Sequence, residues 1–146
     1  YFNVYGPRQD YRRSIPPVMS AFIIKLLKGV QPIIYGDGEK RRDFIHVDDI
    51  NRYHLMCIES DRVDGSTYNL GSGVNYSINE VLGIISSIIG SELTPLYMPE
   101  LDGEASQTLA DIKSAESLGW RCSIEIKDGL TDMVKYFLNN KIPWTT

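Results

Sequence analysis

The sequence has 146 residues, which is the length of one ordinary domain and enough to bury a hydrophobic core. Its formal net charge of −4 argues against nucleic-acid binding, because neutralising phosphates requires a clustered surplus of Lys and Arg. Cys57 and Cys122 form no paired spacing, which is typical of reduced thiols in a cytoplasmic protein, and no apolar run is long enough to suggest a membrane protein.

The first half of the chain alternates short apolar segments with helical patterns. The segment before Gly6-Pro7 reads as a strand that runs into a loop, and Gly29 is placed to end a helix. Asp48 is expected to cap the next helix. The expected elements are a strand at residues 1–5, a helix at 18–28, a strand at 31–35, a hairpin or broad loop over 36–47, and a helix from residue 48.

The second half contains the clearest helix start in the sequence. Ser77 and Glu80 have the spacing of a capping box, and Gly90 is placed to end that helix. The other expected elements are a strand at residues 67–71, a strand at 94–98, a short helix from 111 to 119, and a last helix that carries Leu130, Val134 and Phe137. Strands and helices in rough alternation predict an α/β fold.

Four stretches occur in a characteristic order: YFNVYGPRQ, IIYGDGEKRRDFIHVDDI, YNLGSGVNYSINEV and GEASQTLADIKSAESLGW. They resemble the carboxyl-terminal half of the extended short-chain dehydrogenases/reductases, and most closely the NAD-dependent nucleotide-sugar epimerases and dehydratases around UDP-glucose 4-epimerase. The resemblance implies that residues 1–146 are the substrate-binding portion of such an enzyme. Residues 1–5 and 67–71 would be the last strands of a Rossmann sheet, beside a small α/β domain.

The catalytic motifs of that family are not in these 146 residues. None of the nine tyrosines has Lys four residues later, and the glycines at 71 and 73 are followed by Tyr76 where a dinucleotide fingerprint needs Gly. We therefore expect no catalytic residue and no metal ligand here, and an inactive chain on its own. The resemblance implies that NAD is bound mainly by residues upstream of Tyr1, with Tyr1 and Phe2 near the nicotinamide.

Asn3 is an unusual residue to find near the end of an apolar strand. It either forms a turn before Gly6-Pro7 or points its amide at a ligand. In the family this Asn contacts the nucleotide diphosphate. The resemblance also places Ser14 and Ile15 in a loop that wraps the nucleotide.

Arg42 is the best candidate for a charged contact to a diphosphate, because a guanidinium is a planar, bidentate donor. It immediately precedes DFIH, as the phosphate-binding Arg of the family does. The alternative is a structural ion pair with an aspartate, at 43, 48 or 49. The resemblance places an aromatic residue against the nucleotide base at Tyr35, and the alternative is that Tyr35 is a plain core residue. Ile33 is expected to offer backbone contacts to that base.

Several other polar residues are interpreted as structural. Lys40 and Arg41 are expected to be solvated turn residues, and the acidic stretch with Glu100 and Glu104 a solvated loop. His46 is interpreted as a packed histidine that bonds to backbone and not as a general base. One departure from the family pattern is Leu101, which stands where epimerases usually have a second phosphate-binding Arg.

The resemblance implies a function as well as a fold. The parent enzyme would be a homodimer that acts on a nucleotide diphosphate sugar by transient hydride transfer at sugar C4, with no nucleic-acid or membrane partner. The alternatives are a reductase or decarboxylase of the same family, or a non-catalytic module. Without neighbours for the strands at 1–5 and 67–71, the isolated chain is expected to fold poorly.

Overall fold

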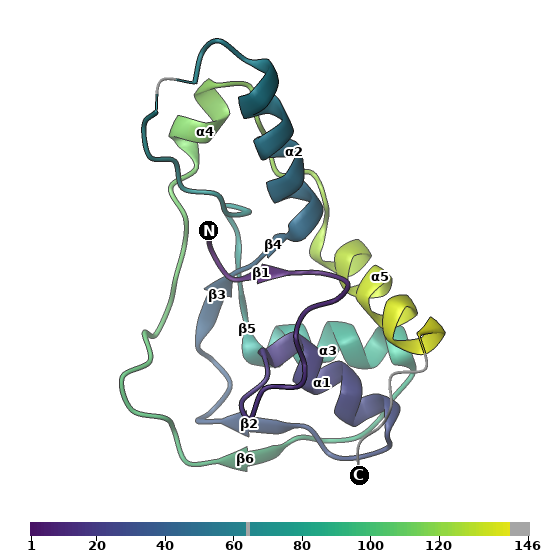
Figure 1. Cartoon of the computed structure of the whole chain (residues 1–146). Coiled ribbons are helices and arrows are strands. Elements are labelled where there is room, and N and C mark those ends of the chain that lie inside the picture. Colours follow the sequence, from purple (N-terminus) through teal and green to yellow (C-terminus); the bar gives the residue numbers. More distant parts are fainter. Residues whose placement is uncertain (64, 141–146) are drawn as a thin grey trace.

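The structure is a computed structural model that describes residues 1–63 and 65–140 (Figure 1). Its strands are short, at two or three residues each, while its longer helices span ten to fourteen. In chain order the elements are β1 (Val4–Tyr5), α1 (Val18–Leu27), β2 (Ile33–Tyr35), β3 (Arg41–Asp43), β4 (Ile45–His46), α2 (Val47–Glu59), β5 (Asn75–Ser77), α3 (Ile78–Ile89), β6 (Leu96–Met98), α4 (Lys113–Ser117) and α5 (Ile126–Asn139). The α/β class predicted from the sequence is confirmed.

The strands pair into three small two-stranded sheets. β1 runs parallel to β4, and β2 runs parallel to β6. β3 runs antiparallel to β5, with Arg42 opposite Tyr76. The segment over residues 36–47 is therefore not a hairpin, because β2 and β3 each pair with a strand from later in the chain, and it is not a broad loop either, because it contains β3 and β4.

The two strands expected at residues 1–5 and 67–71 differ from the prediction. The first is limited to Val4–Tyr5, and it has a neighbour in β4, contrary to our expectation. The prediction of a strand at residues 67–71 is wrong for this structure, since no strand is assigned there. The amide of Phe2 donates to the carbonyl of Leu70 at 2.9 Å, so the two segments still touch. Their place in a Rossmann sheet stays a prediction.

The helices agree closely with the sequence patterns. Ser77 Oγ accepts from the amide of Glu80 at 3.1 Å, and Glu80 Oε2 accepts from the amide of Ser77 at 2.7 Å, which completes the predicted capping box of α3. Gly90 ends that helix with a φ of 75°. α1 ends as expected, with the Gly29 amide donating to the Leu26 carbonyl.

The cap of α2 is the exception, because His46 and not Asp48 is its N-cap. The Nδ1 atom of His46 accepts from the amide of Asp48 at 3.3 Å. Asp48 is the second residue of the helix and lies in its first turn, where its negative charge is favoured by the positive end of the helix dipole. The interpretation of His46 as a packed histidine that bonds to backbone is confirmed.

Two hydrophobic clusters hold the chain together. The larger one joins α1, α3 and α5, at the lower end of Figure 1, around fully buried residues such as Phe22, Ile85 and Phe137. The smaller one joins α2 and α4 at the upper end, around Tyr53, Ala115 and Trp120. The strands β1, β3, β4 and β5 lie between the two clusters (Figure 1).

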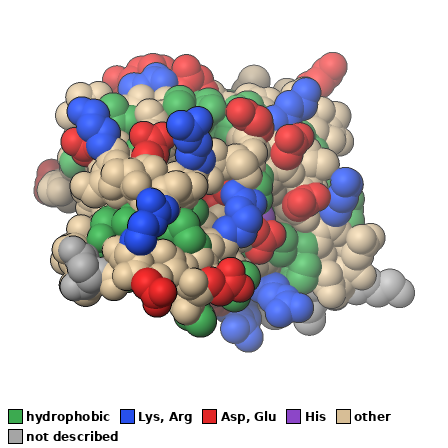
Figure 2. All heavy atoms as spheres, turned by 90° about the horizontal axis from the view of Figure 1, so that it is seen from above, with side chains coloured by type: hydrophobic (Ala, Val, Ile, Leu, Met, Phe, Trp, Pro, Cys, Tyr) green, Lys and Arg blue, Asp and Glu red, His purple; other side chains and the backbone are tan. Residues whose placement is uncertain are grey.

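The surface over the α2 and α4 end carries charges of both signs among apolar and uncharged groups (Figure 2). Within the described ranges, no helix combines the length and apolar character needed to cross a bilayer.

Candidate functional site

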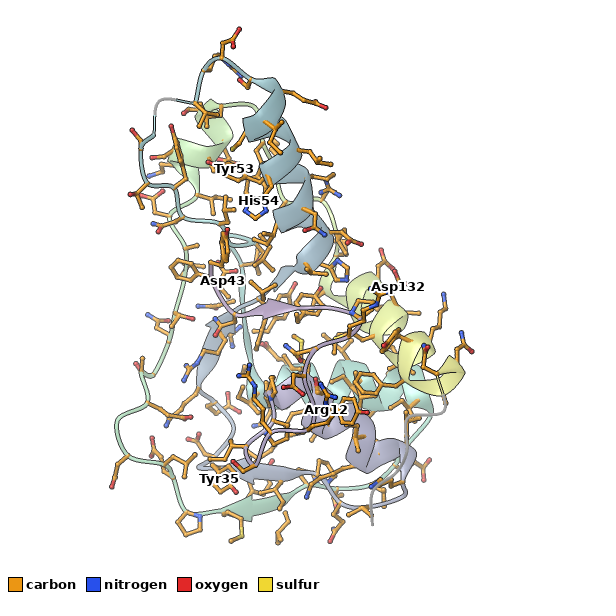
Figure 3. All side chains as sticks on the ribbon, in the orientation of Figure 1. Arg12, Tyr35, Asp43, Tyr53, His54 and Asp132 are labelled. Atoms are coloured by element: carbon orange, nitrogen blue, oxygen red, sulfur yellow. The ribbon has the colours of Figure 1, made fainter. Side chains whose placement is uncertain are left out.

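The carboxylate of Asp43 is the centre of the polar structure around β3. This side chain has no exposed surface. It accepts hydrogen bonds from the amide and hydroxyl of Ser72 at 2.7 and 2.8 Å, from the amide of Gly73 at 3.1 Å and from the amide of Ala110 at 3.0 Å. Asp43 lies in the middle of the molecule in Figure 3. It therefore ties β3 to two segments that are distant in sequence, at residues 71–73 and 108–110.

Gly71 is required for this arrangement. A Cβ atom built on Gly71 would lie 2.4 Å from Cβ of Ala110 and 2.8 Å from Oδ2 of Asp43, closer than real side chains approach. The amides of Ser72 and Gly73 can both reach the carboxylate of Asp43 only because Gly71 has no side chain. The first glycine of GSG thus has a packing role.

A second segment flanks β3 on the edge opposite β5. The amide of Arg41 donates to the carbonyl of Ser106 at 2.9 Å, and the amide of Thr108 donates to the carbonyl of Arg41 at 3.0 Å. Arg41 and Gln107 form a parallel bridge. This pairing brings the end of the acidic stretch at residues 100–104 beside the side chains that leave β3.

The amide of Asn3 contacts β3 directly. Nδ2 of Asn3 donates to the carbonyl of Asp43 at 2.6 Å and to Oγ1 of Thr108 at 3.3 Å. The backbone φ of Asn3 is 25°, which agrees with the turn-forming interpretation. The structure thus places Asn3 next to the residue that follows Arg42, on an exposed part of the chain. Its contact with a diphosphate stays a prediction.

The side chain of Arg42 is only 17% exposed, and its one ion pair among the described residues is long. Its Nη1 atom donates to the carbonyl of Arg41 at 2.9 Å, and its Nη2 atom lies 3.9 Å from Oε2 of Glu104. The acid that pairs with Arg42 is therefore Glu104. The alternative from the sequence was an ion pair with an aspartate at 43, 48 or 49. That alternative is wrong among the described residues, and the guanidinium retains donors for another anion.

The two residues before Arg42 are not solvated turn residues, as we had expected. Nζ of Lys40 lies 2.8 Å from Oε1 of Glu100 and 2.9 Å from Oε2 of Glu104, and these hydrogen bonds raise the pKa of Lys40. Glu100 and Glu104 are thus ion-pair partners of Lys40, and the loop that carries them is exposed, as expected.

Arg41 is also held in place. Its Nε atom donates to Oδ1 of Asn75 at 2.8 Å, and its Nη2 atom contacts Oε2 of Glu80 at 2.9 Å. Since Glu80 also closes the capping box, Arg41 ties β3 to the start of α3.

The residues expected to contact the base and the nucleotide loop lie farther from Asp43. Tyr35 ends β2 opposite Met98 and is 45% exposed, so the plain-core interpretation is wrong. Ile33 is half-buried on the same strand. Ser14 and Ile15 are exposed in the loop before α1, and Ile15 is 78% exposed. Figure 3 shows Tyr35 and Asp43 at different levels of the molecule, and the ligand roles of these residues stay predictions.

Tyr1 and Phe2 lie near α2. The hydroxyl of Tyr1 is 2.7 Å from Nε2 of His54, and the Tyr1 ring is 72% exposed. Phe2 is half-buried and uses its amide in the bond to Leu70. The two residues offer an exposed aromatic face and no cationic group. Without a cationic group they are unsuited to the pyrophosphate of NAD, and their place at the edge of the nicotinamide ring stays a prediction.

Asp49 is a second buried carboxylate that the sequence did not reveal. It has no exposed surface and accepts from the amides of Ser123 at 3.1 Å and Ile124 at 3.2 Å, and from Sγ of Cys122 at 3.2 Å. Arg52 contacts the same carboxylate. The carbonyl of Asp49 also accepts from Nε1 of Trp120 at 3.0 Å. One residue of α2 therefore anchors the loop at 120–124.

One surface groove lies elsewhere, between α3 and the start of α5. It has a volume of about 460 Å³ and is lined by Tyr76, Glu80, Gly83, Ile84, Ser87 and Lys127. None of the site residues predicted from the sequence lines it.

His46 has a buried ring with one unsatisfied nitrogen. It is 2% exposed, and its Nε2 atom has no hydrogen-bond partner in the described structure. Because Nδ1 accepts from a backbone amide, the proton of the neutral ring belongs on Nε2. Burial lowers the pKa of His46, against the opposing charge of Asp48. A buried cation here would lack solvation, so the folded protein favours the neutral ring.

We expect this lowered pKa to make the fold less stable in mild acid. The unfolded chain takes up the proton near the ordinary histidine pKa of about 6.5, and the folded chain only at lower pH. The contribution of the neutral His46 ring to folding stability is therefore complete above the ordinary histidine pKa, and it is lost as the pH falls toward the pKa of the folded state. Urea unfolding between about pH 7 and pH 5 should show a steeper loss of stability in the wild type than in His46→Gln. His54→Gln, at an exposed histidine, is the control, and equal slopes for His46→Gln and wild type would contradict the assignment.

Comparisons with known proteins extend the resemblance seen in the sequence. The model of the NAD-dependent epimerase/dehydratase family matches residues 1–71. A putative UDP-glucose 4-epimerase of Methanocaldococcus jannaschii is 40% identical over 140 residues, which are 96% of this chain and 45% of that protein.

Two solved structures share the fold over 96% of this chain. One is UDP-N-acetylglucosamine 4-epimerase from Methanobrevibacter ruminantium in complex with UDP-N-acetylmuramic acid, with a TM-score of 0.90 and 35% identity. The other is UDP-glucose 4-epimerase from Thermotoga maritima with UDP-glucose, with a TM-score of 0.89 and 33% identity. The chain spans 45% of the length of each. The ordered motifs, the α/β fold and these similarities together show that residues 1–71 belong to the NAD-dependent epimerase/dehydratase family and that the chain matches the carboxyl-terminal portion of such extended short-chain dehydrogenases/reductases.

Proposed function

We propose that this chain binds the nucleotide diphosphate sugar in an NAD-dependent epimerase or dehydratase that resembles UDP-glucose 4-epimerase. The observation that carries the proposal is the guanidinium of Arg42, which is fixed on β3, is largely shielded from solvent and, among the described residues, pairs only with Glu104, at 3.9 Å. A cation in that state can offer charge-assisted hydrogen bonds to phosphate oxygens. Solvent screening is weak at such a position, so each bond contributes more than it would on an open surface.

The surroundings of Arg42 support a role in positioning. β3 is paired on both edges and is anchored through Asp43, so the guanidinium is held by backbone that cannot shift easily. A diphosphate fixed there would orient the sugar ring at the other end of the ligand. Binding energy at a remote group is then used to place the reacting carbon, which raises the rate of the chemical step.

The other candidate residues have smaller roles in this proposal. Asn3 would contact the diphosphate, although its amide would first have to leave the carbonyl of Asp43. Tyr35 would lie against the base with its exposed ring, and Ile33 would offer backbone groups to it. Ser14 and Ile15 would close over the nucleotide from the loop before α1.

The chemistry itself would take place on residues outside this sequence. NAD, when bound, would supply the hydride acceptor for C4 of the sugar, and this chain would contribute only Tyr1 and Phe2 at the nicotinamide edge. The Tyr-x-x-x-Lys pair does not occur among the 146 residues, so we propose that they are inactive alone. We further propose a homodimeric, cytoplasmic parent enzyme.

Arg42→Ala in the full-length protein is expected to weaken binding of UDP-glucose roughly tenfold to a hundredfold. The variant loses hydrogen bonds from a charged group, each of which contributes about 1.5 to 3 kcal/mol. Isothermal titration calorimetry with UDP-glucose measures the effect. Arg121→Ala is the matched control, because Arg121 is exposed and has no ion pair among the described residues. An affinity that does not change in Arg42→Ala would refute the proposed role.

A further inference from the structure

One carboxylate oxygen lies between two cations beside β3. Oε2 of Glu104 is 2.9 Å from Nζ of Lys40 and 3.9 Å from Nη2 of Arg42. Both distances end on the same atom, so the ammonium and guanidinium groups are close neighbours with one negative atom between them. The negative charge on that oxygen offsets the repulsion between the two positive charges. Lys40 and Arg42 therefore form a two-cation cradle that is occupied by a side chain of the same protein.

The two cations of the cradle are more deeply set than the acid that occupies it. The side chains of Lys40 and Arg42 are 13% and 17% exposed, whereas that of Glu104 is 41% exposed. The carbonyl of Lys40 accepts from the amide of Ile78, and Arg42 is held by its bond to the Arg41 carbonyl. The cations thus belong to the fixed part of the fold, and the anion reaches them from the solvent side.

Glu104 comes from an irregular loop that is anchored at both ends. Residues 99–105 follow β6 and lead into the segment at 106–108 that pairs with β3. A turn at Asp102 and Gly103 reverses the chain, and Gly103 adopts a φ of 80°. The turn brings Glu100 onto Lys40 as well, at 2.8 Å. The loop therefore delivers two carboxylates to a cation without help from a helix or strand.

We infer that Glu104 is an internal anion that a diphosphate displaces, and that Lys40 is the second cation of the diphosphate site. The inference rests on the function proposed above for Arg42. A diphosphate carries more charge and more acceptor oxygens than one carboxylate, so it can contact both cations at once. Displacement costs the contact between Glu104 and Lys40, which lowers the affinity of every anion. Glu104 therefore selects strongly charged ligands over singly charged ones.

The test measures dissociation constants of inorganic pyrophosphate for variants of the full-length protein. Pyrophosphate has no ribose or base, so it reports on the cradle alone. Glu104→Gln is expected to tighten pyrophosphate binding roughly fivefold to tenfold, because the competing charge is removed. Lys40→Gln is expected to weaken it roughly tenfold. Asp102→Asn is the control, since it removes the same charge from the same loop at a residue without an ion pair in the described structure, and its affinity should stay close to that of wild type.

Glu104→Asp provides a second variant in which the charge is kept on a shorter side chain, and pyrophosphate should then bind with intermediate affinity. Circular dichroism confirms that each variant is folded. Unchanged or weaker binding in Glu104→Gln would overturn the internal-anion inference, and it would leave the role of Arg42 intact if Arg42→Ala still weakens UDP-glucose binding. An affinity in Lys40→Gln equal to that of wild type would overturn the assignment of the second cation. If Arg42→Ala has no effect either, the proposed function fails as well.

Discussion

Asp43→Ala is expected to lower the free energy of unfolding by about 3 to 5 kcal/mol, which would be a large part of the stability of a domain this size. The substitution removes a buried carboxylate and leaves the amides of Ser72, Gly73 and Ala110 without an acceptor. Each unsatisfied buried donor costs about 1 to 3 kcal/mol. Water molecules that enter the vacated space and accept from these amides reduce that cost. Urea unfolding followed by circular dichroism measures the loss.

Asp102→Ala is the control for that experiment, because its carboxylate is exposed and should contribute little. A loss below about 1 kcal/mol in Asp43→Ala would mean that the segments at 71–73 and 108–110 are held by other contacts. The experiment also bears on function. If β3 loses its anchor, Arg42 is no longer held rigidly, and UDP-glucose should bind more weakly to Asp43→Ala even where the variant is folded.

Asp49→Ala is expected to lower the free energy of unfolding by about 3 to 5 kcal/mol for the same physical reason, at the start of α2. The amides of Ser123 and Ile124 lose their acceptor, and Arg52 loses the carboxylate that it contacts. The bond from Trp120 to the carbonyl of Asp49 survives, because alanine keeps that carbonyl. The loss of local stability should therefore be largest in the loop after Trp120.

Hydrogen exchange distinguishes this local effect from general loosening. In Asp49→Ala the amides of Ser123 and Ile124 should exchange much faster, while amides in the middle of α3 should change only by the overall loss of stability. The neighbouring Asp48→Ala is the matched control, because Asp48 is exposed and lies at the same helix end. Equal exchange at the loop in both variants would contradict the anchoring role of Asp49.

The helices could be predicted from the sequence because their signals are local. The capping box of α3 depends on residues three positions apart, and Gly29 and Gly90 end their helices through contacts with the preceding turn. The strands depend on partners far along the chain. Arg42 pairs opposite Tyr76, and no pattern within β3 indicates that choice. For the same reason the segment at 67–71 looked like a strand but has no ladder here.

The candidate site was predicted in part. Arg42 and Asn3 were identified through a motif, and the structure brings both to β3. The partners Glu100 and Glu104 could not be predicted, because the pairing with Lys40 depends on how the loop folds back over more than fifty residues. The anchoring role of Asp43 had only a weak signal in the sequence, which is an acidic residue next to the apolar pair Phe44 and Ile45. Burying a carboxylate there is costly unless it is hydrogen-bonded.

The most direct test of the central claim is a crystal structure of the full-length protein with UDP-glucose. We predict that the guanidinium of Arg42 lies within hydrogen-bonding distance of the ligand's diphosphate, on the side of β3 where Glu104 now approaches it. A diphosphate bound away from β3, with Arg42 still facing Glu104, would contradict it.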